Sequence, residues 1–177
     1  MYRKIRESRC ICTLNRSGKT GNLKEKLTGE YTNVRKKYPF DENCSYCAEG
    51  KLLDAFGIKI GELPMSKVIL FKEQSHKGRI IVASKAHVDD ISDLTKEERA
   101  QFMEDVSHVA SIMHELFHPD KINFGAYGDT MHHLHFHLVP KYKDGFEWGG
   151  VFAMNPQKTF LTDEEYAQLI QMIREKL

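Results

Sequence analysis

The sequence predicts an α+β domain, built on an antiparallel sheet of about five strands with one long helix and a C-terminal helix. Three observations support this fold class. Short strand-like runs follow one another with breaks that are too short for parallel crossovers, which need about a dozen residues. One long amphipathic segment lies in the middle of the chain, and a shorter one ends it. The resulting order is β-β-β-α-β-β-α without an internal repeat.

The expected strands are short runs rich in β-branched and apolar residues. Three of them are residues 51–60, 67–73 and 78–84, separated by Gly-Glu-Leu-Pro and Ser-His-Lys-Gly, which suit turns and short loops. Two more are expected at residues 121–127 and 133–139. Pro140 is expected to end the pairing of the last strand, because proline cannot donate to a sheet ladder.

Both helices begin with a capping-box signature. Thr95 with Glu98, and Thr162 with Glu165, each combine a hydroxyl with a carboxylate three residues later, ahead of an apolar run. Pro119 closes the longer helix. Its apolar stripe at helical spacing comprises Phe102, Met103, Val106, Val109, Ala110, Met113, Leu116 and Phe117.

Length and composition describe an ordinary globular protein. The 177 residues fit one domain with a buried core, and 41% are hydrophobic and 29% charged. No apolar run approaches the length of about 18 residues that marks a membrane span, and the N-terminus lacks the apolar core of a secretory signal. A cytoplasmic location is therefore expected. In that reducing compartment the four cysteines are expected to be thiols or metal ligands.

The charge is distributed unevenly along the chain. Residues 1–37 carry eleven basic and three acidic side chains, a net charge of +8, whereas residues 38–177 carry −7. We expect a basic extension over residues 1–37, partly ordered at best, and a compact domain over residues 38–177. A basic arm of this kind contacts nucleic acid or another polyanion in some proteins, and is a solvated tail or an intersubunit strap in others.

The stretch MHHLHFHLVP, residues 131–140, concentrates histidines on one predicted strand. Alternate side chains of a strand point the same way, so His133, His135 and His137 share one face, at a spacing of roughly 6.5–7 Å. The apolar residues between them face the core. Such a row of imidazoles suits a metal cage, or a nucleophile flanked by groups that bind phosphate and handle protons.

The segment HHLHFHLVP resembles the signature of the histidine triad (HIT) family. Three other segments are similar to features of that family in the same order: CSYC to its zinc-binding cysteine pair, GRIIVASKAHVDDISDL to its strand-then-histidine segment, and KINFGAYGD to the loop before the triad. The similarity covers residues 38–142. It implies a HIT-like fold, a homodimer, and a purine nucleotide or nucleotide conjugate as the ligand.

The resemblance also implies a reaction. The family hydrolyses or transfers nucleotides at the α-phosphate through a nucleotidyl-histidine intermediate, on substrates such as nucleoside phosphoramidates and dinucleoside polyphosphates. His135 matches the nucleophile, whose other ring nitrogen is oriented by a backbone carbonyl near the first histidine. His137 matches the residue that holds a phosphate oxygen as charge builds, and Thr130 matches a hydroxyl near the α-phosphate or leaving group.

Four further residues are expected to bind the nucleotide. Asn123 matches an asparagine that helps to hold it, and Glu73 falls near an acidic position that contacts the ribose. Two residues depart from the family pattern: Asp129 stands where many members have glutamine, and Arg79 stands where relatives often have histidine. Arginine binds phosphate but is a poor proton donor, because it remains charged.

Cys44 and Cys47 have C-x-x-C spacing, which is typical of half of a tetrahedral zinc site. The other half is either the C-x-C pair at residues 10–12 or, following the family, His87 with His133. A thiol pair without metal, and an open zinc site made by all three triad histidines, are the remaining alternatives. We expect a structural zinc ion with four protein ligands: Cys44, Cys47, His87 and His133.

Two other functions remain open at this stage. The chain is also consistent with a non-catalytic nucleotide-sensing or partner-binding module. The basic extension favours a third reading, a nucleic-acid-associated hydrolase that acts on adenylated ends.

Overall fold

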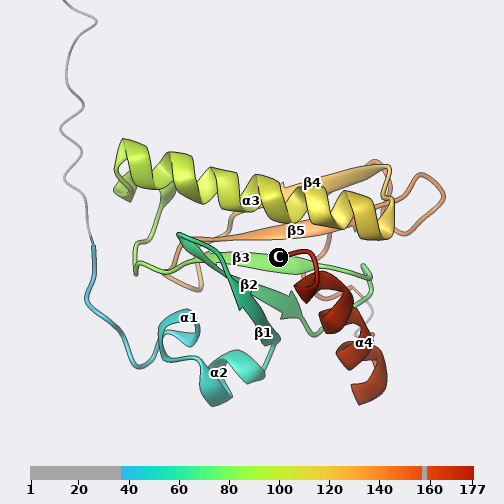
Figure 1. The fold of residues 1–177 in the computed structure, drawn as a ribbon, viewed down its shortest axis with the longest axis horizontal. Coiled ribbons are helices and arrows are strands. Elements are labelled where there is room, and N and C mark those ends of the chain that lie inside the picture. Colours follow the sequence, from blue (N-terminus) through green and yellow to red (C-terminus); the bar gives the residue numbers. More distant parts are fainter. Residues whose placement is uncertain (1–36, 157–158) are drawn as a thin grey trace, which may run out of the picture. The chain divides into compact units, whose positions relative to one another are not determined.

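The computed structural model describes residues 37–156 and 159–177, and it contains a five-stranded antiparallel sheet in the order β1-β2-β3-β5-β4 (Figure 1). The predicted α+β architecture is therefore confirmed. Most of the predicted basic extension lies outside the described residues, together with Cys10 and Cys12. The strands are β1 Gly57–Glu62, β2 Ser66–Phe71, β3 Ile80–Ser84, β4 Lys121–Gly125 and β5 His135–Lys141.

The two long helices, α3 (Lys96–Phe117) and α4 (Asp163–Arg174), begin where their capping boxes predict. The hydroxyl of Thr95 accepts a hydrogen bond from the Glu98 amide at 3.0 Å, and the Glu98 carboxylate accepts one from the Thr95 amide at 2.9 Å. Thr162 and Glu165 make the same pair of bonds. In the described part of the chain, no helix has the length and apolar composition needed to cross a membrane.

The sheet separates two apolar clusters, one on each face. The larger cluster joins the inner sides of α3 and α4 to strand residues such as Val68, Ile80 and Leu138. The smaller cluster lies on the opposite face, where Ile69, Phe71, Ile81 and Ala83 pack against Cys44, Tyr46 and Leu53. Because side chains alternate along each strand, residues one position apart belong to different clusters.

A buried carboxylate ties α3 to the β1–β2 hairpin. Asp105 is 3% exposed, and its Oδ2 accepts hydrogen bonds from the Met65 amide at 2.8 Å and the Ser66 hydroxyl at 2.7 Å. Gln101 donates to the other oxygen at 3.2 Å. These bonds supply the partners that a buried carboxylate requires.

The strand prediction for residues 51–60 is partly wrong. Residues Gly50–Asp54 form a short helix, α2, which follows another short helix, α1 (Ser45–Ala48), and strand β1 begins only at Gly57. The adjacent leucines explain the difference, because the helical turn buries Leu53 and leaves Leu52 exposed without any alternation. Short apolar runs of this kind do not distinguish a strand from a helix.

The prediction that Pro140 ends the last strand is also wrong. Strand β5 continues to Lys141, and Pro140 pairs with Ile122 of β4. The last pair between β5 and β3 joins Leu138 to Ile80, so Pro140 has a neighbouring strand on one side only. Proline is tolerated there for the same reason that it is tolerated in edge strands.

Candidate functional site

The three triad histidines lie on the sheet face opposite α3, as their alternation predicts. His135 and His137 belong to β5, and His133 lies just before it. The ring of Tyr46 in α1 contacts His133 and His135, with centroid distances of 5.1 and 4.9 Å. All three histidines are buried, whereas Leu134 and Leu138 point into the larger cluster on the other face.

His135 has one ring nitrogen committed to the backbone. Its Nδ1 lies 2.6 Å from the carbonyl oxygen of His133. Because a carbonyl oxygen can only accept, Nδ1 carries the proton and Nε2 retains a free lone pair. Burial lowers the pKa of His135, although the bond to the His133 carbonyl acts in the opposite direction. The side chain is therefore a neutral imidazole with Nε2 available as a nucleophile.

His137 has the opposite arrangement. Nη2 of Arg79 lies 3.1 Å from Nδ1 of His137. A guanidinium group can only donate, so Nδ1 accepts and the imidazole proton is on Nε2. Burial lowers the pKa of Arg79 to about 10, which leaves it charged at neutral pH. The pair thus gives His137 a hydrogen-bond donor on its free side.

A cavity of about 510 Å³ opens over these two histidines. Its wall is largely apolar and aromatic, and its polar groups gather near the triad, which is typical of small-molecule sites. Asp129 and Thr130 lie on this lining, so the structure places both beside the triad. The complete lining is Ser45, Tyr46, Leu52, Ala55, Phe56, Phe71, Tyr127, Asp129, Thr130, Met131, His135, His137 and Met154.

Asn123 lies at the margin of this arrangement. It pairs with Val139 in the β4–β5 ladder, two positions beyond the pair of Gly125 with His137. Asn123 therefore shares the sheet face of His137. It is not among the residues that line the cavity. Its predicted contact with the nucleotide stays a prediction.

Glu73 lies outside the cavity lining, and its predicted contact with the ribose stays a prediction. Its side chain is 3% exposed. Oε1 accepts hydrogen bonds from the amides of Ser75 at 3.1 Å and Thr159 at 3.0 Å. The carboxylate therefore joins the β2–β3 loop to the segment that precedes α4. Its negative charge also raises the pKa of the buried Arg79.

The four predicted metal ligands meet at one end of the triad. The nitrogen and sulfur atoms that Cys44, Cys47, His87 and His133 offer all lie within 4.8 Å of one another. Nδ1 of His133 is 3.4 Å from Sγ of Cys44 and 3.7 Å from Sγ of Cys47. Tetrahedral zinc separates such ligand atoms by about 3.3–3.8 Å.

Both histidines of this cluster are oriented by backbone carbonyls. Nε2 of His87 donates to the carbonyl of His132, and Nε2 of His133 donates to that of Ser84, each at 2.8 Å. Each ring therefore keeps a lone pair on Nδ1. Nδ1 of His87 is buried without a hydrogen-bond partner. Metal-binding histidines usually have this outer hydrogen bond, so the residues fit a closed tetrahedral metal site.

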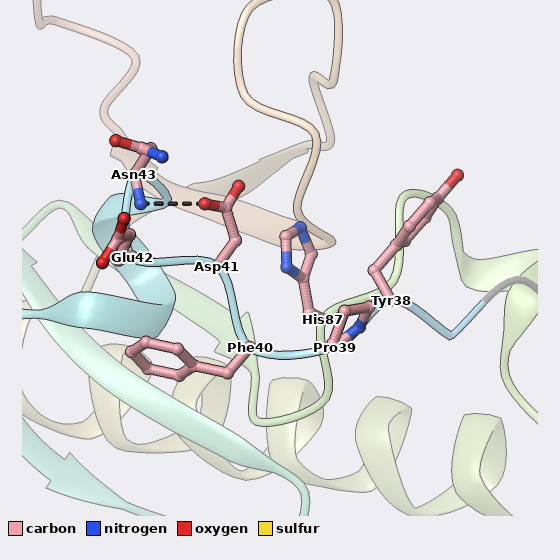
Figure 2. A pocket seen from close by; sticks show the side chains of 7 residues that line it. All are labelled: Tyr38, Pro39, Phe40, Asp41, Glu42, Asn43 and His87. Carbon is pink, nitrogen blue, oxygen red and sulfur yellow. Dashed lines mark hydrogen bonds between the residues drawn. The ribbon is translucent and has the colours of Figure 1, made fainter.

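The segment before Cys44 brings the two halves of the cluster together. Residues 38–43 run past His87 and form a second cavity with it, of about 490 Å³ (Figure 2). The Tyr38 amide donates to the His87 carbonyl, and the Tyr38 hydroxyl donates to Asp89, each at 2.9 Å. These bonds hold the cysteine segment against the loop that carries His87.

Three contributors to the site were not predicted from the sequence. Tyr46 lies between the two cysteines and contacts His133 and His135. Its position within CSYC was the one sequence feature that could have indicated a place in the site. Phe152 and Met154 reach Arg79 from the loop after β5. That loop has neither strand nor helix periodicity, so nothing in its pattern indicates a contact with β3.

Comparison with known proteins is consistent with this geometry. Residues 57–144 match the family model of the HIT domain. These residues form a domain of the histidine triad family. The crystal structure of a histidine triad protein from Bradyrhizobium japonicum is similar, with a TM-score of 0.66 and 26% sequence identity. The match covers 72% of this chain and 95% of that chain.

Two curated relatives of this histidine triad protein match over a smaller share of the chain than that crystal structure does. "Protein hit" of Bacillus subtilis (strain 168) is 27% identical over an alignment of 124 residues, and the match covers 63% of this chain and 79% of that protein. A bis(5'-adenosyl)-triphosphatase of Dictyostelium discoideum is 33% identical over an alignment of 75 residues, and the match covers 40% of this chain. This second match spans 50% of the length of that enzyme.

Proposed function

We propose that this protein is a nucleotide hydrolase or transferase. It acts at the α-phosphate of a nucleoside phosphoramidate or a dinucleoside polyphosphate, through a covalent nucleotidyl-His135 intermediate. The main support is the 2.6 Å hydrogen bond from Nδ1 of His135 to the His133 carbonyl, which leaves Nε2 free in the cavity. The relationship to a bis(5'-adenosyl)-triphosphatase supports the same reaction class.

The reaction has two displacements. Nε2 of His135 attacks the α-phosphorus, and the bond to the leaving group breaks with its electron pair on that group. The carbonyl of His133 stabilises the positive charge of the nucleotidyl-imidazolium through Nδ1–H. Water, or an acceptor in a transferase, then attacks phosphorus, and the phosphorus–nitrogen bond breaks to restore neutral His135. The proton released by water leaves with the product or passes to solvent.

The other cavity residues bind and orient the substrate. His137 presents its Nε2–H to a phosphoryl oxygen, and the Thr130 hydroxyl lies on the same lining. Donors placed where charge develops stabilise the transition state of phosphoryl transfer. The apolar wall, which includes Leu52 and Phe56, suits a purine base.

Zinc is the metal that we propose for the cluster of Cys44, Cys47, His87 and His133. Two thiolates and two imidazoles are a common donor set for structural zinc, and four protein ligands leave no open position for water. The ion would join α1 to the segment before β5. That connection supports the His133 carbonyl, and through it the orientation of His135.

We also propose that the protein is a homodimer. Within the described residues, β4 lies at the edge of the sheet, and its Phe124 is 50% exposed. An unpaired strand edge with an exposed aromatic side chain is suited to pairing with a second copy. Light scattering of the full chain tests this point, and a monomer at micromolar concentration would exclude it.

Trapping of the intermediate tests the enzyme proposal. The protein is incubated with adenosine 5'-phosphoramidate or diadenosine tetraphosphate, quenched, digested and analysed by mass spectrometry. We expect an adenylylated peptide that contains His135. His135→Ala should not form this adduct, and its turnover number should be at least about 1,000-fold lower than that of the parent protein. Its affinity for the nucleotide should change little. His132→Ala is the matched control, because that side chain is 76% exposed.

The opposite outcome has a clear reading. If neither substrate is turned over, no adduct forms, and His135→Ala binds nucleotide as the parent protein does, the enzyme proposal fails. The chain would then be a nucleotide-binding module without chemistry at His135.

A further inference from the structure

Arg79 is a buried cation immediately before β3. Its side chain has no measurable exposure. Among the residues that the structure describes, no carboxylate lies within ion-pair distance of its guanidinium group, although Glu73 and Glu147 raise its pKa from a longer range. A buried charge without a direct partner is costly and is rarely retained without a role.

The guanidinium group is held in one orientation. It lies over the Phe71 ring at 4.1 Å and near the Phe152 ring at 5.2 Å, which are favourable cation–π distances. Nη1 donates to the carbonyl of Met154 at 2.7 Å, and Nη2 lies 2.8 Å from the thioether of the same residue. Contacts from β2 and from the loop after β5 thus fix the direction in which Nη2 points.

Nη2 points at Nδ1 of His137, at 3.1 Å. A proton on Nδ1 would place two donors against each other, and an imidazolium would also place a second positive charge beside Arg79, so that nitrogen must accept. The other rings around His137 are Phe71, Tyr127, His135 and Phe152, and none of them brings a carboxylate to the imidazole. Burial, the charge of Arg79 and the proximity of His135 together lower the pKa of His137 to about 2.

We propose that Arg79 is a positioning residue that keeps His137 a neutral Nε2–H donor, and that the site therefore prefers nucleoside phosphoric anhydrides over phosphoramidates. The inference rests on the proposed function, because it specifies the substrate class for the same nucleophile. It follows from the contacts of Arg79 with His137 and Met154, which only the folded chain brings together.

The chemistry of the leaving group makes this distinction. A neutral imidazole donates a hydrogen bond but does not release its remaining proton, so His137 stabilises charge without acting as an acid. When His135 attacks an anhydride, the phosphorus–oxygen bond breaks and the electron pair stays on a phosphate oxyanion, with no proton required. An amine leaving group departs readily only if its nitrogen is protonated. Besides His135 and His137, the cavity lining carries no lysine, arginine or histidine, and its other groups of this kind are the carboxylate of Asp129 and the phenols of Tyr46 and Tyr127. An ionised carboxylate accepts a proton, and a phenol is a weaker acid than an imidazolium, so these groups do not replace an imidazolium as the proton donor.

The parent protein provides the first test. We compare kcat/KM for diadenosine tetraphosphate with adenosine 5'-phosphoramidate, and for the 4-nitrophenyl with the phenyl ester of adenosine 5'-monophosphate. Within the ester pair, kcat/KM should be higher for the 4-nitrophenyl ester, because its leaving group is the better oxyanion. Diadenosine tetraphosphate should likewise have a higher kcat/KM than the phosphoramidate. Each ratio should be at least about 100-fold, the usual contribution of a general acid that this site lacks.

Equal values for anhydride and phosphoramidate would overturn the inference, even if both substrates form the His135 adduct. Absence of the adduct with every substrate would instead count against the proposed function. The two failures are therefore distinguishable in one set of measurements.

Variants of Arg79 provide the second test. Arg79→Met removes the hydrogen-bond donor and the positive charge beside His137, so His137 can take up a proton. The ratio of kcat/KM for the anhydride to kcat/KM for the phosphoramidate should then fall at least about tenfold. Arg79→Lys keeps a positive charge beside the imidazole and should retain most of the ratio. A ratio that is unchanged in Arg79→Met would contradict the role of Arg79.

The tautomer is observable without any variant. Correlation of histidine ring nitrogens and protons by NMR should place the His137 proton on Nε2, and this imidazole should not titrate between pH 8 and roughly pH 5. A proton on Nδ1, or protonation within that range, would overturn the inference. This measurement decides the question even if neither Arg79 variant folds.

Discussion

The carbonyl oxygen of His133 lies 2.6 Å from Nδ1 of His135, while the imidazole of His133 lies 3.4 Å from Sγ of Cys44. One residue therefore contributes its side chain to the proposed zinc site and its backbone carbonyl to the orientation of the proposed nucleophile. If both proposals hold, His133 connects the zinc site to the reaction without placing a metal in the cavity. Damage to the cluster should reach His135 through the position of a carbonyl group.

Cys44→Ser should lower metal content, thermal stability and kcat together. Loss of the metal would displace the His133 carbonyl, which would then orient His135 less well. We expect kcat to fall about 10- to 100-fold, the range typical when a residue that positions a functional side chain is lost. KM should change less, because the lining of the cavity keeps its residues. Metal analysis, thermal unfolding and steady-state kinetics measure the three effects.

Cys10→Ser is the matched control for this prediction, because Cys10 belongs to the alternative four-cysteine site. It should leave metal content and kcat unchanged. Full metal occupancy in Cys44→Ser, with loss of metal in Cys10→Ser, would favour the four-cysteine alternative and contradict the cluster proposed here.

Gly125→Ala should reduce activity more than stability. Gly125 pairs with His137 across the β4–β5 ladder, and a Cβ there would lie 2.6 Å from the Tyr127 ring and 2.8 Å from the Phe152 ring. Tyr127 lines the cavity and Phe152 packs beside Arg79, so their displacement disturbs the substrate and the Arg79–His137 pair. We expect kcat/KM to fall by roughly tenfold, as small displacements in preorganised sites do.

Gly128→Ala is the comparison for this substitution. A Cβ at Gly128 has no atom within 4 Å, and its backbone angle is ordinary for an alanine. Its kcat/KM should remain within about twofold of the parent value. Equal losses in the two variants would show that contacts with Tyr127 and Phe152 are not responsible.

Asp105→Ala should destabilise the fold without any direct effect on chemistry. It removes the acceptor of the Met65 amide and the Ser66 hydroxyl in a buried region between α3 and the β1–β2 hairpin. Leaving such donors unsatisfied lowers the free energy of unfolding by about 2–4 kcal/mol. Denaturant unfolding measures the loss, and Glu104→Ala, on the exposed side of the same helix, should stay within about 0.5 kcal/mol of the parent.

Stability should fall as the solution becomes acidic, in part because of His137. In the unfolded chain this imidazole takes up a proton below about pH 6.5, whereas in the fold its pKa is lowered to about 2. Between these values the unfolded state binds more protons, so lower pH favours unfolding. The contribution of His137 is up to about 1.4 kcal/mol per pH unit.

His137→Gln isolates this contribution from the other titrating groups. The slope of unfolding free energy against pH is measured by denaturant titration from pH 7 to about pH 5. In this variant it should be shallower by up to about 1.4 kcal/mol per pH unit, which corresponds to one proton taken up on unfolding. His132→Gln, which removes an exposed histidine instead of the buried one, is the matched control. An unchanged slope in His137→Gln would mean that His137 is not buried as a neutral group.

Local sequence signals predicted the elements with strong periodicity or clear termini. Both long helices begin at their capping residues, Thr95 and Thr162, because these signals depend on hydrogen bonds within one turn. Strand-like apolar runs also predicted β2, β3 and β4, and the alternation of histidines with apolar residues predicted β5. Prediction failed for α2, because the adjacent Leu52 and Leu53 give no alternation that distinguishes a helix from a strand. It also failed at Pro140, because a proline fits within β5 only where the pairing with β3 has already ended.

The sequence by itself determined that His133, His135 and His137 share one face, because the twofold repeat of a strand is local. Only the tertiary structure decided their different environments. The antiparallel register sets Ile81 opposite His137 and so brings Arg79 close to that imidazole, while Glu73 turns away to the segment before α4. These contacts join residues far apart in the chain, and they depend on strand register and loop path, which no local pattern encodes.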